Sequence, residues 1–151
     1  MAIPKASKLT VIFLTVAALA VALTTIAAIT VNQSVSSSGT ITAEPNVGVY
    51  SNSACTASLT SINWGSIEAG NSASQTIYVK DTGGVPMTLS LAVSNWSPST
   101  ASTYITLTWT GQGSQIYAGG SLAVTLTLTV SSSTPTNITS FSNSITISGT
   151  D

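Results

Sequence analysis

The side chains that could do chemistry in this chain of 151 residues are few and widely spaced. There is no histidine, and the only carboxylate side chains are Glu44, Glu68, Asp81 and Asp151. General acid–base catalysis needs a histidine or paired carboxylates whose pKa values are pushed apart. The many serines have no nearby base to activate them. The sequence therefore predicts that the protein is not an enzyme.

The same scarcity argues against metals, cofactors and nucleic acids. A zinc site needs clustered cysteine and histidine ligands, whereas Cys55 is the only cysteine. A calcium site needs a loop rich in carboxylates, and no loop here has two acids close together. A nucleic-acid surface needs lysine and arginine to neutralise phosphates, but the chain has three lysines and no arginine. We expect no metal, no cofactor and no nucleic-acid partner.

The remaining polar surface consists mainly of hydroxyl groups. Serine and threonine together account for 51 residues. From residue 30 onward there is one lysine against four acidic side chains, a net charge of −3. Such a surface should respond weakly to salt and to pH. The single Cys55 cannot close a disulfide within the chain. We expect it to be a small buried residue, the alternative being a bond between chains.

An apolar segment near the N-terminus predicts export from the cytoplasm. Leu9–Ile29 reads LTVIFLTVAALAVALTTIAAI and follows the basic start MAIPKASK. A positive end before an uncharged apolar run is typical of an export signal. Small residues at 20–22 and 26–28 allow cleavage, while the length also suits a retained membrane helix. In either case the bulk of the chain is expected to be extracellular.

Beyond this segment, apolar and polar residues alternate in short runs that end at Gly, Pro, Asn or Ser, which is typical of β-strands. The loops are expected at 94–102, 111–120 and 131–140. The pattern predicts an all-β, immunoglobulin-like or jelly-roll-type two-sheet sandwich of about seven to nine strands, preceded by a hydrophobic export helix. The expected strands are Ser36–Ala43, Val47–Tyr50, Gln75–Lys80, Met87–Val93, Tyr104–Thr110, Ser121–Val130 and Phe141–Ile147.

The alternation also predicts the core. Trp64 is expected to plug one edge of the sandwich at a strand end, with Gly65 turning the chain sharply after it. Lys80–Gly84 is expected to close the following strand in a turn. The predicted core residues are Trp64, Ile77, Val79, Leu89, Leu91, Ile105, Leu107, Trp109, Leu122, Val124, Leu126 and Leu128.

Three stretches carry a resemblance to a known family. They read INWGSIEAGNSASQTIYVKDTGGVPMTLSL from residue 62, SNWSPSTASTYITLTWT from residue 94 and LAVTLTLTVSSS from residue 122. Together they resemble the subunits of archaeal bundling pili, which are related to the TasA and camelysin biofilm-matrix fibre proteins. The resemblance covers roughly residues 36–149.

The resemblance implies a homopolymer in which the N-terminal segment of one subunit completes the sandwich of the next. Ile29, Val31 and Val35 are the donor-strand residues expected from it, because Ile29 and Val31 are two apart, as one face of an inserted strand requires. The alternative is that these residues belong to an ordinary flexible linker or to a first strand of the sandwich. The implied organisation is a signal peptide at 1–28, a donor segment at 29–43 and a sandwich at 44–151. The implied partners are identical subunits, with lateral bundling of filaments. Contact with a membrane is expected only through the N-terminal segment before processing.

Two other readings stay open. The apolar segment could remain as a helix in the core of a filament, as in type IV pilins and archaella. Alternatively, it could anchor a non-polymerising binding module, which would predict exposed aromatic side chains. Three glycosylation sequons also occur, at Asn32, Asn95 and Asn137, of which Asn137 lies in an expected loop and Asn95 is followed closely by a proline.

Overall fold

The computed structural model describes residues 34–43 and 46–151, so the export segment and the predicted donor residues Ile29 and Val31 lie outside the described part. This part contains one short helix, α2 (Ala101–Tyr104), among nine strands. The strands are β1 (Ser34–Ala43), β2 (Val47–Tyr50), β3 (Ser61–Glu68), β4 (Ser72–Asp81), β5 (Met87–Ser97), β6 (Ile105–Trp109), β7 (Gln115–Ile116), β8 (Ser121–Val130) and β9 (Ser140–Thr150).

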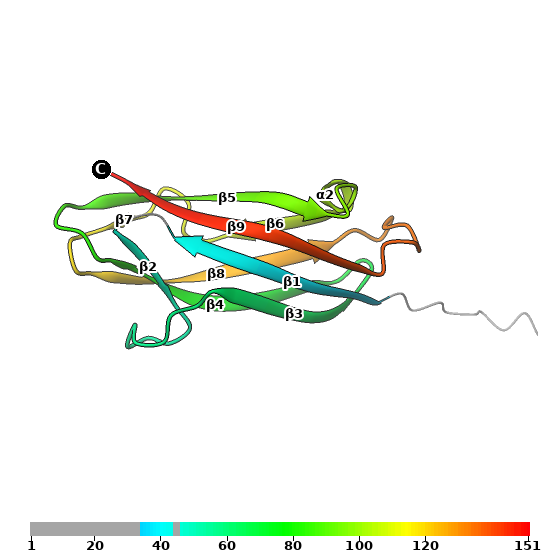
Figure 1. The fold of residues 1–151 in the computed structure, drawn as a ribbon, viewed down its shortest axis with the longest axis horizontal. Helices are drawn as coiled ribbons and strands as arrows, with labels where there is room; N and C mark the ends of the chain where they lie inside the picture. Colours follow the sequence, from blue (N-terminus) through cyan, green and yellow to red (C-terminus); the bar gives the residue numbers. More distant parts are fainter. Residues whose placement is uncertain (1–33, 44–45) are drawn as a thin grey trace, which may run out of the picture. The chain divides into compact units, whose positions relative to one another are not determined.

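The strands form two sheets. One has the order β3-β1-β9-β5-β7 and the other the order β2-β4-β8-β6. Figure 1 shows the larger sheet running from β5 through β9 and β1 to β3, with β8 and β4 behind it. Inward-facing apolar side chains of both sheets make up one core cluster. The prediction of an all-β two-sheet sandwich is confirmed.

Strand β8 shows why the sequence folds in this way. Val124, Leu126, Leu128 and Val130 point into the core and are at most 1 % exposed. The threonines between them face outward, where the β-branched side chain favours extended backbone and the hydroxyl stays hydrated. Two of these threonines also bond across to β4, with Oγ–Oγ1 distances of 2.9 Å for Ser72–Thr129 and 3.0 Å for Ser74–Thr127.

Most of the predicted core residues are buried, and four are only half-buried. Leu91, Leu107, Trp109 and Leu122 pack against the core from its margin. Leu107 and Trp109 lie on β6, an edge strand of the smaller sheet. Leu91 lies on β5 beyond the short stretch that β7 covers. The buried members are Trp64, Ile77, Val79, Leu89, Ile105, Val124, Leu126 and Leu128.

The expectation for Trp64 and Gly65 was wrong in its local geometry. Trp64 is buried, but it lies in the middle of β3 rather than at a strand end. Gly65 has a φ of 71°, but the chain does not turn there. Instead, the pairing register between β1 and β3 shifts at this point. A glycine with positive φ serves a β-bulge as readily as a turn. The chain reverses later, at Gly70, which has a φ of 89°.

Two other expectations were also wrong. The predicted loop at 94–102 starts too early, because β5 continues to Ser97 through an irregularity between Ser94 and Ser97. Asn95 occupies this irregularity with a φ of 53°, a conformation that asparagine tolerates better than most residues. Cys55 is a half-exposed thiol in the loop after β2 rather than a buried residue.

Candidate functional site

The N-terminal strand β1 lies inside its sheet rather than at an edge. It pairs antiparallel with β3, from Ser34↔Glu68 to Thr40↔Ser61, and parallel with β9, from Ser36↔Ser140 to Ala43↔Ile147. Figure 1 shows β1 between these two strands, with its arrowhead pointing the same way as that of β9. Within the described part, β1 is the only strand to which β3 is paired in its sheet. β1, the first strand of the described part, therefore connects β3 to the rest of the larger sheet.

We refer to the position that β1 occupies between β3 and β9 as the β3/β9 slot. Four residues of β1 point from it into the core, namely Val35, Ser37, Gly39 and Ile41. Val35 and Ile41 are apolar, whereas Ser37 is polar and Gly39 has no side chain. The middle of the slot is therefore filled only by the hydroxyl group of Ser37 and the Cα hydrogen of Gly39. The neighbouring strands β3 and β9 contribute the large side chains of Trp64 and Phe141 to the core nearby.

Buried polar atoms without a hydrogen-bond partner gather at this slot. Among the described residues they are Ser37 Oγ on β1, Trp64 Nε1 on β3, and both Nδ2 and Oδ1 of Asn143 on β9; the one elsewhere is Asp81 Oδ2. Asn143 is the Cα partner of Gly39. A buried polar group without a partner costs roughly 1–3 kcal/mol. The chain's own strand is therefore a poor chemical match for the slot that it fills.

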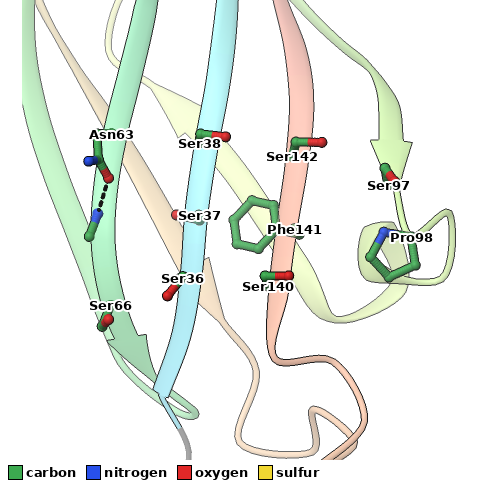
Figure 2. Close-up of a pocket in the computed structure, with 11 residues that line it drawn as sticks. Ser36, Ser37, Ser38, Asn63, Ser66, Ser97, Pro98, Ser140, Phe141 and Ser142 are labelled. Carbon is green, nitrogen blue, oxygen red and sulfur yellow. Dashed lines mark hydrogen bonds between the residues drawn. The ribbon is translucent and has the colours of Figure 1, made fainter.

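A shallow groove lies on the outer face of the same strands. Figure 2 shows it near the start of β1, where Ser36 and Ser38 of β1 lie beside Ser140 and Ser142 of the neighbouring strand β9. Its volume is about 640 Å³. The groove has no charged side chain among its lining residues, so it offers neutral hydrogen bonds and no acid, base or anion site. The lining residues are Ser36, Ser37, Ser38, Asn63, Gly65, Ser66, Ser97, Pro98, Ser140, Phe141 and Ser142.

The described part has few charged side chains. No group of three or more metal-ligating side chains occurs among residues 34–43 and 46–151. Asp81 is fully buried, and its Oδ1 accepts the Gly83 amide N–H at 2.8 Å. That contact fixes the turn after β4, as local carboxylate–backbone bonds commonly do. Asp81 therefore has a structural role in the turn after β4.

The structure places the other predicted site residues as follows. Val35 is on β1 and is fully buried in the sheet of its own chain. Asn137 is exposed in the connection from β8 to β9, and Asn95 is exposed on β5, where its Nδ2 donates to Ser144 Oγ at 3.2 Å. Asn32 lies outside the described residues. Helices long and apolar enough to cross a bilayer do not occur in the part of the chain that the structure describes.

Sequence reasoning missed the inward side of the slot. Ser37, Gly39 and Asn143 were not singled out, because they are short polar or small residues in runs where such residues are common. A detectable signal was Asn143, which breaks the apolar alternation of Phe141, Ile145 and Ile147 at an inward position of β9. A polar residue on a core face is more informative than an apolar one on a surface.

A scan against protein-family models and a search of curated proteins each found no match for this chain.

Proposed function

We propose that this chain is the structural subunit of an extracellular filament, a pilus or a biofilm-matrix fibre, and that it polymerises by donating its N-terminal strand to a neighbouring subunit. The observation that carries the proposal is the position of β1. A terminal strand lies between two strands that would otherwise have open edges, and 33 further residues precede it in the sequence. In this proposal the sandwich is of the immunoglobulin-like or jelly-roll type.

The topology makes exchange of β1 between chains simple. Because β1 is the first strand of the described part, it can leave the β3/β9 slot without threading through any other connection of that part. Its departure exposes unpaired N–H and C=O groups on both β3 and β9, which another strand can pair. Donating an identical element from a second copy restores the same main-chain bonds. An exchange that runs from each subunit to the next produces an open fibre rather than a closed dimer.

The surface is suited to a filament made of identical subunits. The described part has one lysine, Lys80, and its outward strand faces are mainly serine and threonine. Hydroxyl-rich, nearly neutral faces can approach one another without repulsion between like charges, which supports lateral bundling of filaments. The export segment and the family resemblance support a location at the cell surface, with processing before residue 29.

A binding module is supported less well by the aromatic side chains. Trp64 is buried, and Trp96 packs against Phe141 with ring centroids 5.6 Å apart. Trp109 is half-buried, and its Nε1 donates to Gln112 Oε1 at 3.1 Å. Among the described residues, the aromatic ring that is strongly exposed is that of Tyr117. A single exposed ring does not make the aromatic platform that the binding-module reading predicts.

A reversible lock on β1 tests the proposal. The Cα partners Ser36 and Ser66 join β1 to β3, so a Ser36→Cys/Ser66→Cys variant, made in a Cys55→Ser background and oxidised at high dilution, should hold β1 in its own sheet. We expect the oxidised subunit to stay monomeric by light scattering and electron microscopy, and to form filaments after reduction.

The control for this lock is a disulfide between strands that the proposal does not separate. Ser90 on β5 and Ser148 on β9 are also Cα partners. A Ser90→Cys/Ser148→Cys variant in the same background should form filaments whether oxidised or reduced. Assembly of the oxidised Ser36→Cys/Ser66→Cys variant at the rate of this control would overturn the proposal.

A further inference from the structure

We infer that the donated strand does not take the register of β1, but enters the neighbour's β3/β9 slot six residues earlier in the sequence. Gln33 then lies against Asn143. This inference rests on the proposed function and adds to it a specific recognition pair. In the shifted register, the inward positions that are held by Val35, Ser37, Gly39 and Ile41 in a single chain are taken by Ile29, Val31, Gln33 and Val35 of the neighbour.

The shift keeps the correct face of the strand inward. Successive side chains of a strand alternate between faces, so only a shift by an even number of residues preserves burial. After a shift of six, the slot receives three branched apolar side chains and one amide instead of two apolar side chains, a hydroxyl and a glycine. Val31 would replace Ser37 beside Phe141, the Cα partner of residue 37 on β9. Apolar burial beside Phe141 increases, and the Ser37 hydroxyl moves from that position to the end of the slot, at the position of Ala43 opposite Ile147.

The side-chain amide of Gln33 can hydrogen-bond to the side-chain amide of Asn143. Asn143 is 3 % exposed, and neither Nδ2 nor Oδ1 has a hydrogen-bond partner among the described residues. A glutamine at the Gly39 position would present one N–H donor and one carbonyl acceptor to these two atoms. A Cβ atom at residue 39 would lie 2.8 Å from Asn143 Oδ1 and 3.0 Å from Ile145 Cδ1, so both side chains must shift to admit it. Both atoms are the far ends of flexible side chains, and the three nearest atoms include none of the backbone.

Even shifts smaller or larger than six do not place Gln33 beside Asn143. A shift of two places Gln33 in the apolar position of Val35, beside Ile67. A shift of four places Gln33 beside Phe141, and a shift of eight places it in the position of Ile41. Each of these buries the glutamine against apolar side chains and leaves Asn143 without an amide partner, which is costly. The shift of six is the one in this range that puts the amide at Asn143.

The same register gives a role to Glu68. In the slot, residue 29 of the donor lies opposite Ile67, next to Glu68, which is exposed at the end of β3. Processing after Ala28, as the sequence predicts, would create a positively charged α-amino group on Ile29. Glu68 is the only charged side chain of β3. A carboxylate beside the new amino group would attract the donor end of the strand.

Cysteine pairs distinguish the registers in filaments of the full mature chain, in a Cys55→Ser background. Gln33→Cys/Asn143→Cys reports the shifted register, and Gly39→Cys/Asn143→Cys reports the unshifted one. Residues 33 and 39 are about 20 Å apart along a strand, so the first pair cannot close within a chain whose β1 is in its own slot. We expect oxidation of filaments to link neighbouring chains through the first pair and not through the second.

The other outcomes separate the inference from the proposed function. Links between chains through the second pair alone would overturn the shifted register while supporting strand donation. Links within single chains through the second pair, with no links between chains in either variant, would overturn both.

A pair of leucine variants gives a second test. Asn143→Leu should leave the thermal stability of the dilute monomer unchanged or raised, because the amide has no partner there, yet raise the critical concentration for assembly by about tenfold. Gln33→Leu should also raise it, and the double variant should restore it to within a few fold of the parent. Assembly of Asn143→Leu at the parental critical concentration, or a monomer destabilised by this change, would contradict the recognition pair.

Discussion

Gly39 and Asn143 are direct partners across the parallel pair β1/β9, and a Cβ atom at residue 39 would lie 2.8 Å from Asn143 Oδ1. The closed chain can thus accept only glycine at this position without moving the asparagine. In the proposed filament, residue 39 lies outside the slot and a glutamine takes its place. The identity of residue 39 should therefore affect the closed subunit and the filament differently.

The first prediction concerns Gly39→Val. Overpacking against Asn143 and Ile145 should lower the free energy of unfolding of the dilute monomer by about 1–3 kcal/mol, as measured by urea denaturation. Because β1 is held less tightly, filaments should form faster, as followed by light scattering. Thr40→Val, on the outward face of the same strand, should change neither quantity appreciably. A Gly39→Val monomer as stable as the parent would contradict the packing described for the slot.

A second prediction concerns the donor segment. Val31→Asp should abolish assembly, because a carboxylate would be buried beside Phe141 without a partner. Asn32→Asp carries the same charge on the opposite face of the strand, so it should assemble normally. Both variants should remain folded as monomers by circular dichroism. Equal filament yields from the two variants would show that residue 31 does not enter a core. Removal of residues 29–35 should likewise leave a soluble, unpolymerised subunit.

The third prediction tests the core. Leu126 has no exposed surface and lies in the middle of β8. Leu126→Asp should prevent folding, because an unpaired buried carboxylate costs several kcal/mol, a large share of the stability of a domain. Ala123→Asp, on the exposed face of the same strand, should fold with a near-parental melting temperature. Secretion of a stable Leu126→Asp protein would overturn the assignment of the core.

The fourth prediction separates backbone conformation from packing. Neither Gly65 nor Gly84 has an atom within 4 Å of the position that a Cβ would take, but only Gly65 has a φ in the left-handed region, at 71°. Gly65→Ala should therefore lower the free energy of unfolding by about 1–2 kcal/mol, whereas Gly84→Ala should change it by less than about 0.5 kcal/mol. Similar values for the two would argue against the bulge at residue 65.

The fifth prediction concerns solution conditions. The chain has no histidine, the side chain whose ordinary pKa falls near 6.5, and few charged groups of any kind. Assembled filaments should therefore keep their length distribution in electron micrographs between about pH 5 and 8, and between low salt and about 1 M NaCl, where charge–charge contacts are screened. Dissolution by salt alone would show that ionic contacts hold the subunits together.

The sequence predicted the strands most reliably where apolar and polar residues alternate without interruption. The bounds of Ser121–Val130 and Val47–Tyr50 agree with β8 and β2. Where a strand contains an irregularity, its predicted bounds were too short or its course was wrong. The reason is that a bulge at Gly65 or at Asn95 interrupts the alternation of apolar and polar residues from which a strand is predicted. Pairing order could not be predicted, since the placement of β1 between β3 and β9 depends on contacts between residues that are distant in sequence.

Of the residues of β1 that fill the β3/β9 slot, only Val35 was predicted from the sequence as a site residue. Val35 was expected to be buried on an inserted strand, and it is buried, although in the sheet of its own chain. Gly39 carries no signal in a sequence rich in small polar residues, and Asn143 shows only as a break in the apolar alternation of β9. That the two residues are partners follows from the register between β1 and β9, which the sequence does not give. The burial of unpartnered amide atoms is a property of the assembled sheet, and no sequence period reveals it.

Cryo-electron microscopy of material sheared from cells that express this chain tests the central claim most directly. The account predicts filaments in which density for the N-terminal segment runs as a β-strand into the neighbouring subunit, between β3 and β9 and parallel to β9. Filaments with a helical core built from residues 9–29 would contradict strand donation, and so would an intact monomer that stays in the membrane fraction and forms no filaments.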